Sequence, residues 1–178
     1  MHHIDDLVQL FNGLFCDSDN TVLQAGADEP FYQAARQPGE RHIIFCRQDY
    51  FASALHEMAH WCIAGAERRL RDDYGYWYEP DGRSVARQAQ FARVEARPQA
   101  LEWIFARACG FPFCISLDNL QGDAGDSGPF RQAVLEQAKQ WQCRGLGSRA
   151  LRLQQALAAH YSQPADYRRY QLDQQELR

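Results

Sequence analysis

Two histidines and a glutamate stand at a spacing that can bind and use a metal ion. The chain reads HEMAH at residues 56–60, so His56 and His60 are four residues apart and Glu57 follows the first histidine. Residues four apart on a helix lie one turn apart on the same face, so both imidazoles can bind one ion. Glu57 is turned by about 100° from His56 and can act on a water molecule at that ion. We therefore predict His56 and His60 as metal ligands and Glu57 as the catalytic residue.

A pair of structural histidines without a metal is the alternative interpretation. Metal binding is favoured because polar side chains in a largely apolar helix are costly to bury without partners. The helix itself is well indicated: residues 50–64 contain no Pro or Gly, and Gly65 offers a stop at the C′ position. Leu55, Met58, Ala59 and Cys62 recur at helical spacing, so one side of this helix is expected to be buried.

A second stretch offers a third ligand. Because Pro98 is tolerated in a first helical turn, a helix can begin near Glu95 and continue to residue 108. Glu95, Gln99 and Glu102 then lie on one face, at positions i, i+4 and i+7. We predict Glu95 as the carboxylate ligand. Glu102 is the alternative ligand or, together with Gln99, a residue that supports the ligands; a solvated polar stripe is the other interpretation.

The elements that must position these residues are helices packed on a small sheet. A β-branched and aromatic strand at residues 42–46 leads directly into the HEMAH helix. The other expected elements are a helix at residues 4–15, a strand at 21–24, a loop or short helix at 84–94, and helices at 129–143 and 148–161. Residues 163–178 are polar and are expected to fray. The sequence thus predicts an α+β fold in a single domain, 1–178.

Two further stretches are candidates for substrate binding. Asp28 and Glu29 belong to a loop with two carboxylates and two aromatic residues, which could face a cationic substrate, although most such loops are only solvated. Tyr76, Trp77 and Tyr78 belong to an aromatic-rich stretch. It forms either an edge strand with a packed aromatic face or an aromatic wall beside the metal.

The composition limits the function classes. Of 178 residues, 46% are hydrophobic and 24% charged, which is ordinary for a globular domain, and the net charge of −4 excludes a broad basic surface for nucleic acid. No apolar run is long enough to cross a membrane, and the first residues lack the features of a signal peptide, so a cytoplasmic protein is expected. The six cysteines form no CxxC pair and are expected to be free thiols rather than metal ligands.

Two histidines and one carboxylate can serve two chemistries. Zinc lowers the pKa of a bound water, and Glu57 can take its proton, which gives a hydrolase. Ferrous iron with the same ligands keeps open positions for dioxygen and substrate, which gives an oxygenase. The ligand types alone do not choose between them.

Several motifs, in their order along the chain, resemble the elongation factor P hydroxylase family. The resemblance runs from about residue 11 to residue 123. The motifs are DEP at 28–30, SALHEMAHWCIAG at 53–65, YGYWY at 74–78, PDGR at 80–83, VE at 94–95, PQALEW at 98–103, GFPF at 110–113 and DNLQGD at 118–123.

The resemblance implies a bacterial cytoplasmic enzyme with a zincin-like, YbeY-like metal fold. Its reaction would be hydroxylation of the β-lysyl-modified lysine of translation elongation factor P, a post-translational modification by a non-haem iron oxidoreductase of the monooxygenase type. Its cofactor would be Fe(II), with molecular oxygen as co-substrate and a reductant that the sequence does not identify. Carried over, His56, His60 and Glu95 would be the ligands. A zinc-dependent hydrolase, similar to peptidases or ribonucleases, remains the alternative.

Overall fold

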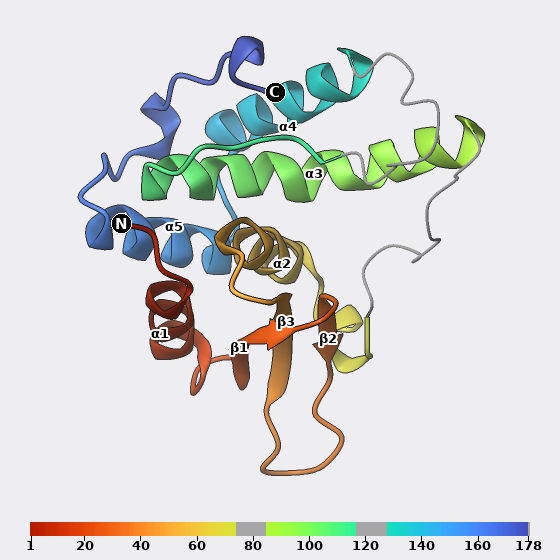
Figure 1. The fold of residues 1–178 in the computed structure, drawn as a ribbon, viewed down its shortest axis with the longest axis vertical. Helices are drawn as coiled ribbons and strands as arrows, with labels where there is room; N and C mark the ends of the chain where they lie inside the picture. The colour runs from red at the N-terminus through yellow and green to blue at the C-terminus, as the bar shows by residue number, and fades with distance from the viewer. Residues whose placement is uncertain (74–84, 117–127, 178) are drawn as a thin grey trace.

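The computed structural model describes residues 1–73, 85–116 and 128–177, without the side chains of residues 85–91 and 176. Within these ranges the chain forms five α-helices and one three-stranded sheet, which confirms the α+β class (Figure 1). No helix of the described part is both long and apolar enough to cross a membrane.

In the described part of the chain, the three strands follow one another between α1 and α2, and only helices come after them. Their bounds are α1 Ile4–Phe15, β1 Thr21–Ala27, β2 Phe31–Gln33, β3 His42–Arg47, α2 Phe51–Ile63, α3 Val85–Cys109, α4 Gly128–Arg144 and α5 Ser148–His160. Three short 3-10 turns lie at Arg68–Leu70, Tyr167–Arg169 and Gln174–Glu176.

The sheet is mixed, with strand order β1-β3-β2. β1 runs parallel to the central strand β3, and β2 pairs with β3 in the antiparallel direction. At the end of β3, Gln48 adopts a left-handed conformation and exchanges two backbone hydrogen bonds with β1, to Gly26 and Ala27. This tight connection fixes the point from which the chain enters α2.

Helix α2 is packed on several sides. It contacts α3 on one side and β3 on the other, as Figure 1 also shows, and it contacts α1 and α5. Leu55, Met58 and Ala59 are fully buried in the core. The ring of Trp61 packs against those of Phe11 and Phe15 on α1, with centroids 5.0 and 4.8 Å apart. The helix that carries the HEMAH sequence is therefore held rigidly on its apolar side.

Helix α3 corrects one expectation. We expected a helix from Glu95, with residues 84–94 as a loop or short helix, but α3 begins at Val85, and Pro98 lies inside it. A proline in a helix removes a single backbone hydrogen bond and clashes with the preceding turn. The burial of Ala96 and Ala100, on either side of the proline, stabilises the helix despite that cost.

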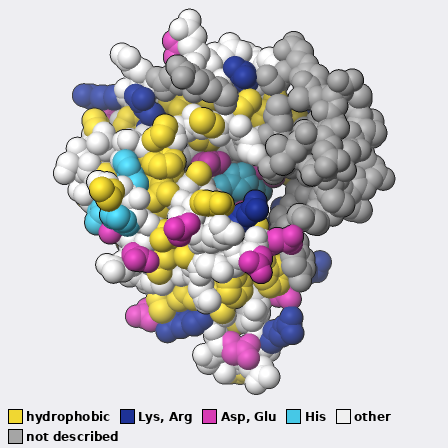
Figure 2. All heavy atoms as spheres, viewed as in Figure 1, with side chains coloured by type: hydrophobic (Ala, Val, Ile, Leu, Met, Phe, Trp, Pro, Cys, Tyr) yellow, Lys and Arg dark blue, Asp and Glu magenta, His cyan; other side chains and the backbone are white. Residues whose placement is uncertain are grey.

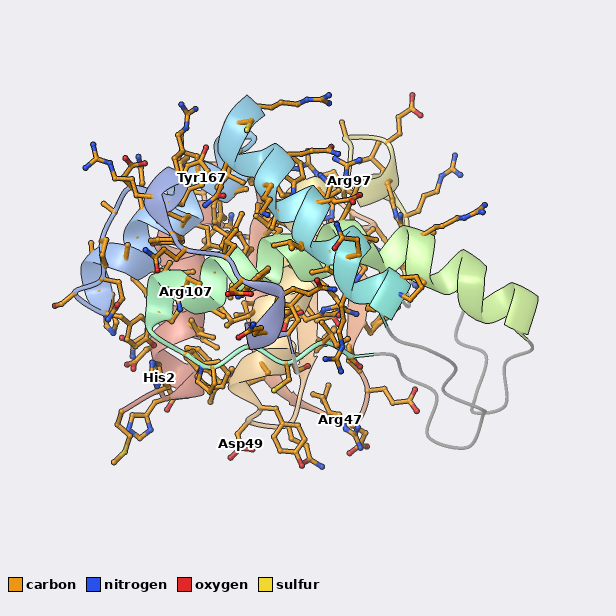
Figure 3. The ribbon with its side chains drawn as sticks, turned by 90° about the horizontal axis from the view of Figure 1, so that it is seen from above. His2, Arg47, Asp49, Arg97, Arg107 and Tyr167 are labelled. Atoms are coloured by element: carbon orange, nitrogen blue, oxygen red, sulfur yellow. The ribbon has the colours of Figure 1, made fainter. Side chains whose placement is uncertain are left out.

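Two other expectations also need correction. Phe31 and Tyr32, the two aromatic residues of the expected loop, lie in the edge strand β2, and β1 extends to Ala27. We expected the C-terminal segment to fray, but it packs on the rest of the chain. Tyr167, Tyr170 and Leu177 are buried. The side-chain amide of Gln142 on α4 donates to the backbone carbonyls of both tyrosines. Seen from above, α4 crosses α3, and Tyr167 lies on the side of α4 and α5 (Figure 3).

Candidate metal centre

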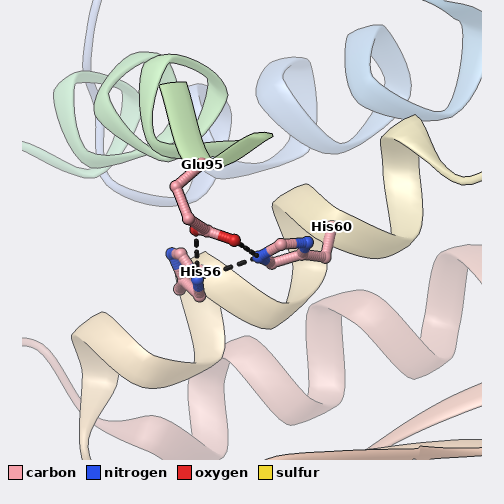
Figure 4. A group of neighbouring side chains, drawn as sticks. All are labelled: His56, His60 and Glu95. Atoms are coloured by element: carbon pink, nitrogen blue, oxygen red, sulfur yellow. Dashed lines mark hydrogen bonds and ion pairs between the residues drawn. The ribbon is translucent and has the colours of Figure 1, made fainter. Parts of the chain in front are cut away.

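Two helices bring the side chains of the candidate metal centre together. His56 and His60 come from successive turns of α2, and Glu95 comes from α3, which packs across it (Figure 4). The Nε2 atoms of the two histidines are 3.0 Å apart. The carboxylate oxygens of Glu95 lie 3.5 Å from Nε2 of His56 and 3.4 Å from Nε2 of His60. Among the described residues this is the one group of His, Cys, Asp or Glu whose ligand atoms all lie within 4.8 Å of one another.

These separations suit a single metal ion. An ion about 2.1 Å from each donor atom would see donors 3.0–3.5 Å apart at angles of roughly 90–115°. Such angles suit a site in which three ligands occupy one side and the opposite positions stay open. The donor set therefore fits a divalent transition metal, and its geometry is compatible with zinc and with iron.

Glu102 is hydrogen-bonded to Nδ1 of His56, the ring nitrogen that does not face Glu95. Its Oε2 atom is 2.8 Å from Nδ1 of His56, and its side chain is 10% exposed. A carboxylate in this position accepts the Nδ1 proton, so the lone pair of Nε2 faces the ion and the ring cannot rotate freely. The structure thus separates the two glutamates, with Glu95 facing both Nε2 atoms and Glu102 behind His56.

Gln99 connects α3 to the chain that follows it. Its side-chain amide donates to the carbonyl of Ser116 at 2.7 Å and accepts from the Ser116 backbone N–H at 3.0 Å. Gln99 also helps to lower the pKa of the Glu95 carboxyl group, four residues earlier on α3. Taken as whole residues, Glu95, Gln99 and Glu102 are only 4%, 1% and 8% exposed, so the polar stripe of α3 faces the interior rather than solvent.

Protonation in the centre follows from the crowding of carboxylates around two histidines. Burial would lower the pKa of His56, but Glu102, Glu95 and Glu57 outweigh it and raise the pKa to about 10. Burial raises the pKa of Glu57 and of Glu102. For Glu95 the effect of burial is overcome by the hydrogen bond from His60 and by both histidines, which lower its pKa. Without a metal, the centre therefore holds a proton at neutral pH that a cation would displace.

A pocket opens beside the centre. Its volume is about 440 Å³, part of it open to solvent. Figure 2 shows histidine side chains at the bottom of a hollow in this face, beside a basic side chain. The residues that line the pocket come from α2, the sheet and the segment after α2: Tyr32, Ile44, Glu57, His60, Trp61, Ala64, Arg68, Arg69 and Asp73.

The other candidate residues do not belong to this group or lie outside the described ranges. Asp28 and Glu29 are exposed in the connection between β1 and β2 and do not belong to the metal-ligand group. Tyr76, Trp77 and Tyr78 lie outside the described residues. The six cysteines are all free, as expected, and none belongs to the ligand group.

Some residues of the pocket had no signal in the sequence. Arg68, Arg69 and Asp73 reach it because the backbone of Asp73 pairs with that of Tyr32 on β2, at 2.8 and 2.9 Å. Arg68 forms an ion pair of 2.6 Å with Asp73. The paired residues are 41 positions apart, and Asp73 lies in an irregular segment, so no local sequence pattern predicts this pairing.

Comparisons with known proteins give one consistent result. The sequence matches the protein family described as "Elongation factor P hydroxylase" over residues 10–171. It is also 49% identical, over 165 residues, to a Haemophilus influenzae protein named "Elongation factor P lysine hydroxylase", and the alignment covers 93% of each chain.

Proposed function

Since the chain belongs to the elongation factor P hydroxylase family, we propose that it hydroxylates a lysine side chain of elongation factor P at the centre formed by His56, His60 and Glu95. The observation that carries the proposal is the convergence of two imidazole Nε2 atoms and one carboxylate from two packed helices. Two histidines and one carboxylate on one side of an ion are the ligand set of non-haem Fe(II) oxygenases.

The proposed reaction has a defined balance. One atom of dioxygen is inserted into a C–H bond of the side chain, and the other leaves as water, which requires two electrons and two protons from a reductant. Bound Fe(II) would supply the oxygen chemistry. A reductant added to the reaction mixture must supply the two electrons.

The residues of this chain hold and orient the reacting groups. His56, His60 and Glu95 would hold the ion through the two Nε2 atoms and the carboxylate. Glu102 fixes the tautomer and the ring plane of His56 through Nδ1. Glu57 lines the pocket beside His60, and burial raises the pKa of its carboxyl group, which favours the protonated form that a proton donor needs. We assign Glu57 that catalytic role.

The substrate proposed is elongation factor P that already carries β-lysine on the target lysine. This modified side chain is long and cationic, and the pocket next to His60 offers matching groups. Asp73 and Glu57 give the pocket two carboxyl groups, and Tyr32 offers an aromatic surface to the aliphatic chain. We propose Asp28 and Glu29, with Tyr76, Trp77 and Tyr78, as outer contacts of the same substrate.

The same proposal includes the fold type, the cellular compartment and the kind of partner. Residues 1–178 act as one domain with a zincin-like fold, in which strand β3 leads through a short connection into the helix that carries both histidine ligands. The enzyme works in the cytoplasm, where translation factors are found. It acts on a protein and does not itself contact nucleic acid or membrane.

Mass spectrometry of the substrate tests the proposal. β-Lysylated elongation factor P is incubated with the protein, ferrous iron, a reductant and air, and the modified peptide is sequenced. We expect one added oxygen on the modified lysine, none under anaerobic conditions, and none with His56→Ala or His60→Ala. Product from either folded histidine variant would remove the ligand assignment. Tightly bound zinc with oxygen-independent cleavage of a substrate would support a hydrolase instead.

A further inference from the structure

The last turn of α2 is closed by an arginine from another helix. The Nη2 atom of Arg149, on α5, donates to the carbonyl oxygens of Trp61 at 3.3 Å, Cys62 at 3.2 Å and Ala64 at 2.6 Å. Its guanidinium group also lies over the ring of Trp61, 4.8 Å from the centroid. One cation thus contacts three main-chain acceptors and an aromatic face at the carboxyl end of the metal-binding helix.

The arginine replaces the glycine cap that we expected. The helix ends at Ile63, where Gly65 predicts a stop, but Gly65 does not adopt the left-handed conformation of a glycine cap. Ala64 is extended, with φ −58° and ψ 129°. The terminal carbonyls of a helix need partners and carry partial negative charge, and a cation satisfies both requirements.

This end of α2 matters because His60 lies in its last turn. The ring of His56 is oriented through Nδ1 by Glu102. Within residues 1–73, 85–116 and 128–177, by contrast, no group hydrogen-bonds to Nδ1 of His60, which contacts the centre only through Nε2. The direction of the His60 ring therefore depends on the backbone of the turn from which it projects.

We propose that Arg149 is a positioning residue for the metal centre: by closing the last turn of α2 it sets the direction of His60. The inference rests on the metal site proposed above. It predicts that the loss of the guanidinium group changes metal binding, through His60, and not only the stability of the protein.

The same helix provides a matched control. Arg152, one turn further along α5, donates to the carbonyl of Leu14 at 2.7 Å, near the end of α1, and lies 4.9 Å over the ring of Phe15. It therefore makes the same kind of contact, a helix-end carbonyl and an aromatic face, on a helix that carries no ligand. Replacement of either arginine by methionine keeps the aliphatic stem and removes the cation.

The test is titration of the metal-free protein with Co²⁺ under anaerobic conditions, followed by proton NMR of the Co²⁺-loaded protein. Arg149→Met should weaken Co²⁺ binding roughly tenfold, which is typical of losing a residue that orients a ligand. The metal-shifted signals of the His60 ring should move more than those of His56. Arg149→Lys, which keeps the charge, should recover part of the affinity, and Arg152→Met should stay within about twofold of wild type.

The control separates positioning from stability. Loss of global stability does not alter a metal dissociation constant while almost all of the protein remains folded. If Arg149→Met binds Co²⁺ as wild type does, or if Arg152→Met weakens binding as much, the inference is wrong. If Arg149→Met does not fold, Arg149→Lys is compared with Arg152→Lys, and equal affinities refute the inference. If the wild type binds no Co²⁺, the metal site itself fails, and this inference fails with it.

Discussion

Glu102 gives the sharpest test of how the centre is organised. The structure places its carboxylate 2.8 Å from Nδ1 of His56, on the side of the ring away from Glu95. Glu102→Gln keeps the shape of the side chain and an oxygen that can accept the Nδ1 proton, but it removes the charge. Glu102→Ala removes the acceptor and leaves a buried ring N–H without its partner.

The magnitudes follow from the hydrogen bond. A bond to a charged group contributes about 1.5–3 kcal/mol and a neutral one about 0.5–1.5 kcal/mol, so loss of the charge costs about 1–1.5 kcal/mol. That is roughly a tenfold loss of metal affinity. An unsatisfied buried donor adds about 1–3 kcal/mol, so Glu102→Ala should lose roughly a hundredfold. Glu95→Ala, which removes a ligand, should lose more than either.

Anaerobic calorimetric titration with Fe²⁺ measures these differences. Glu136→Gln is the matched control, since Glu136 is exposed on α4 and is hydrogen-bonded to Gln132, and it should bind as wild type does. If Glu102→Ala abolished binding while Glu95→Ala retained it, the two glutamates would have exchanged roles. Unchanged affinity in Glu102→Gln and Glu102→Ala would show that the carboxylate does not orient His56.

Three further predictions follow from the same centre. Glu57→Gln should lower kcat about a hundredfold or more, as expected for a proton-transfer residue, with Fe²⁺ affinity within about threefold of wild type. Metal affinity should rise with pH between about 7 and 9, because the proton held by His56 below its pKa of about 10 competes with the ion. Calorimetric titrations in buffers of different ionisation enthalpy should show that about one proton is released for each metal ion bound. Removal of the metal by a chelator should lower Tm by roughly 5–10 °C relative to protein at a free metal concentration of about 100 Kd, since binding then adds about 2.7 kcal/mol to the free energy of unfolding. An unchanged Tm would contradict metal binding to the folded state.

The sequence predicts best what depends on local spacing. His56 and His60 share a face because they are four residues apart on one helix, and no other part of the chain is needed for that inference. Glu95 and Glu102 illustrate the limit. Both lie on the same face of α3, and only the packing of α3 on α2 places one at Nε2 and the other at Nδ1 of His56.

The failures of prediction share a cause in tertiary packing. Pro98 is typical of a first helical turn, yet burial around it keeps it inside α3. Strand β2 has three residues and exists because the edge of β3 offers it a partner. Arg149 contacts the end of α2 from 85–88 residues away, so its role has no local signature at all.

The central claim is that this centre adds an oxygen atom from dioxygen to a lysine side chain of elongation factor P. The most direct measurement incubates β-lysylated elongation factor P with the iron-loaded protein and a reductant under ¹⁸O₂, and sequences the modified peptide by mass spectrometry. The account predicts one ¹⁸O atom on the modified lysine with wild type and none with His60→Ala. Oxygen derived from water, or a substrate that gains no oxygen, would contradict it.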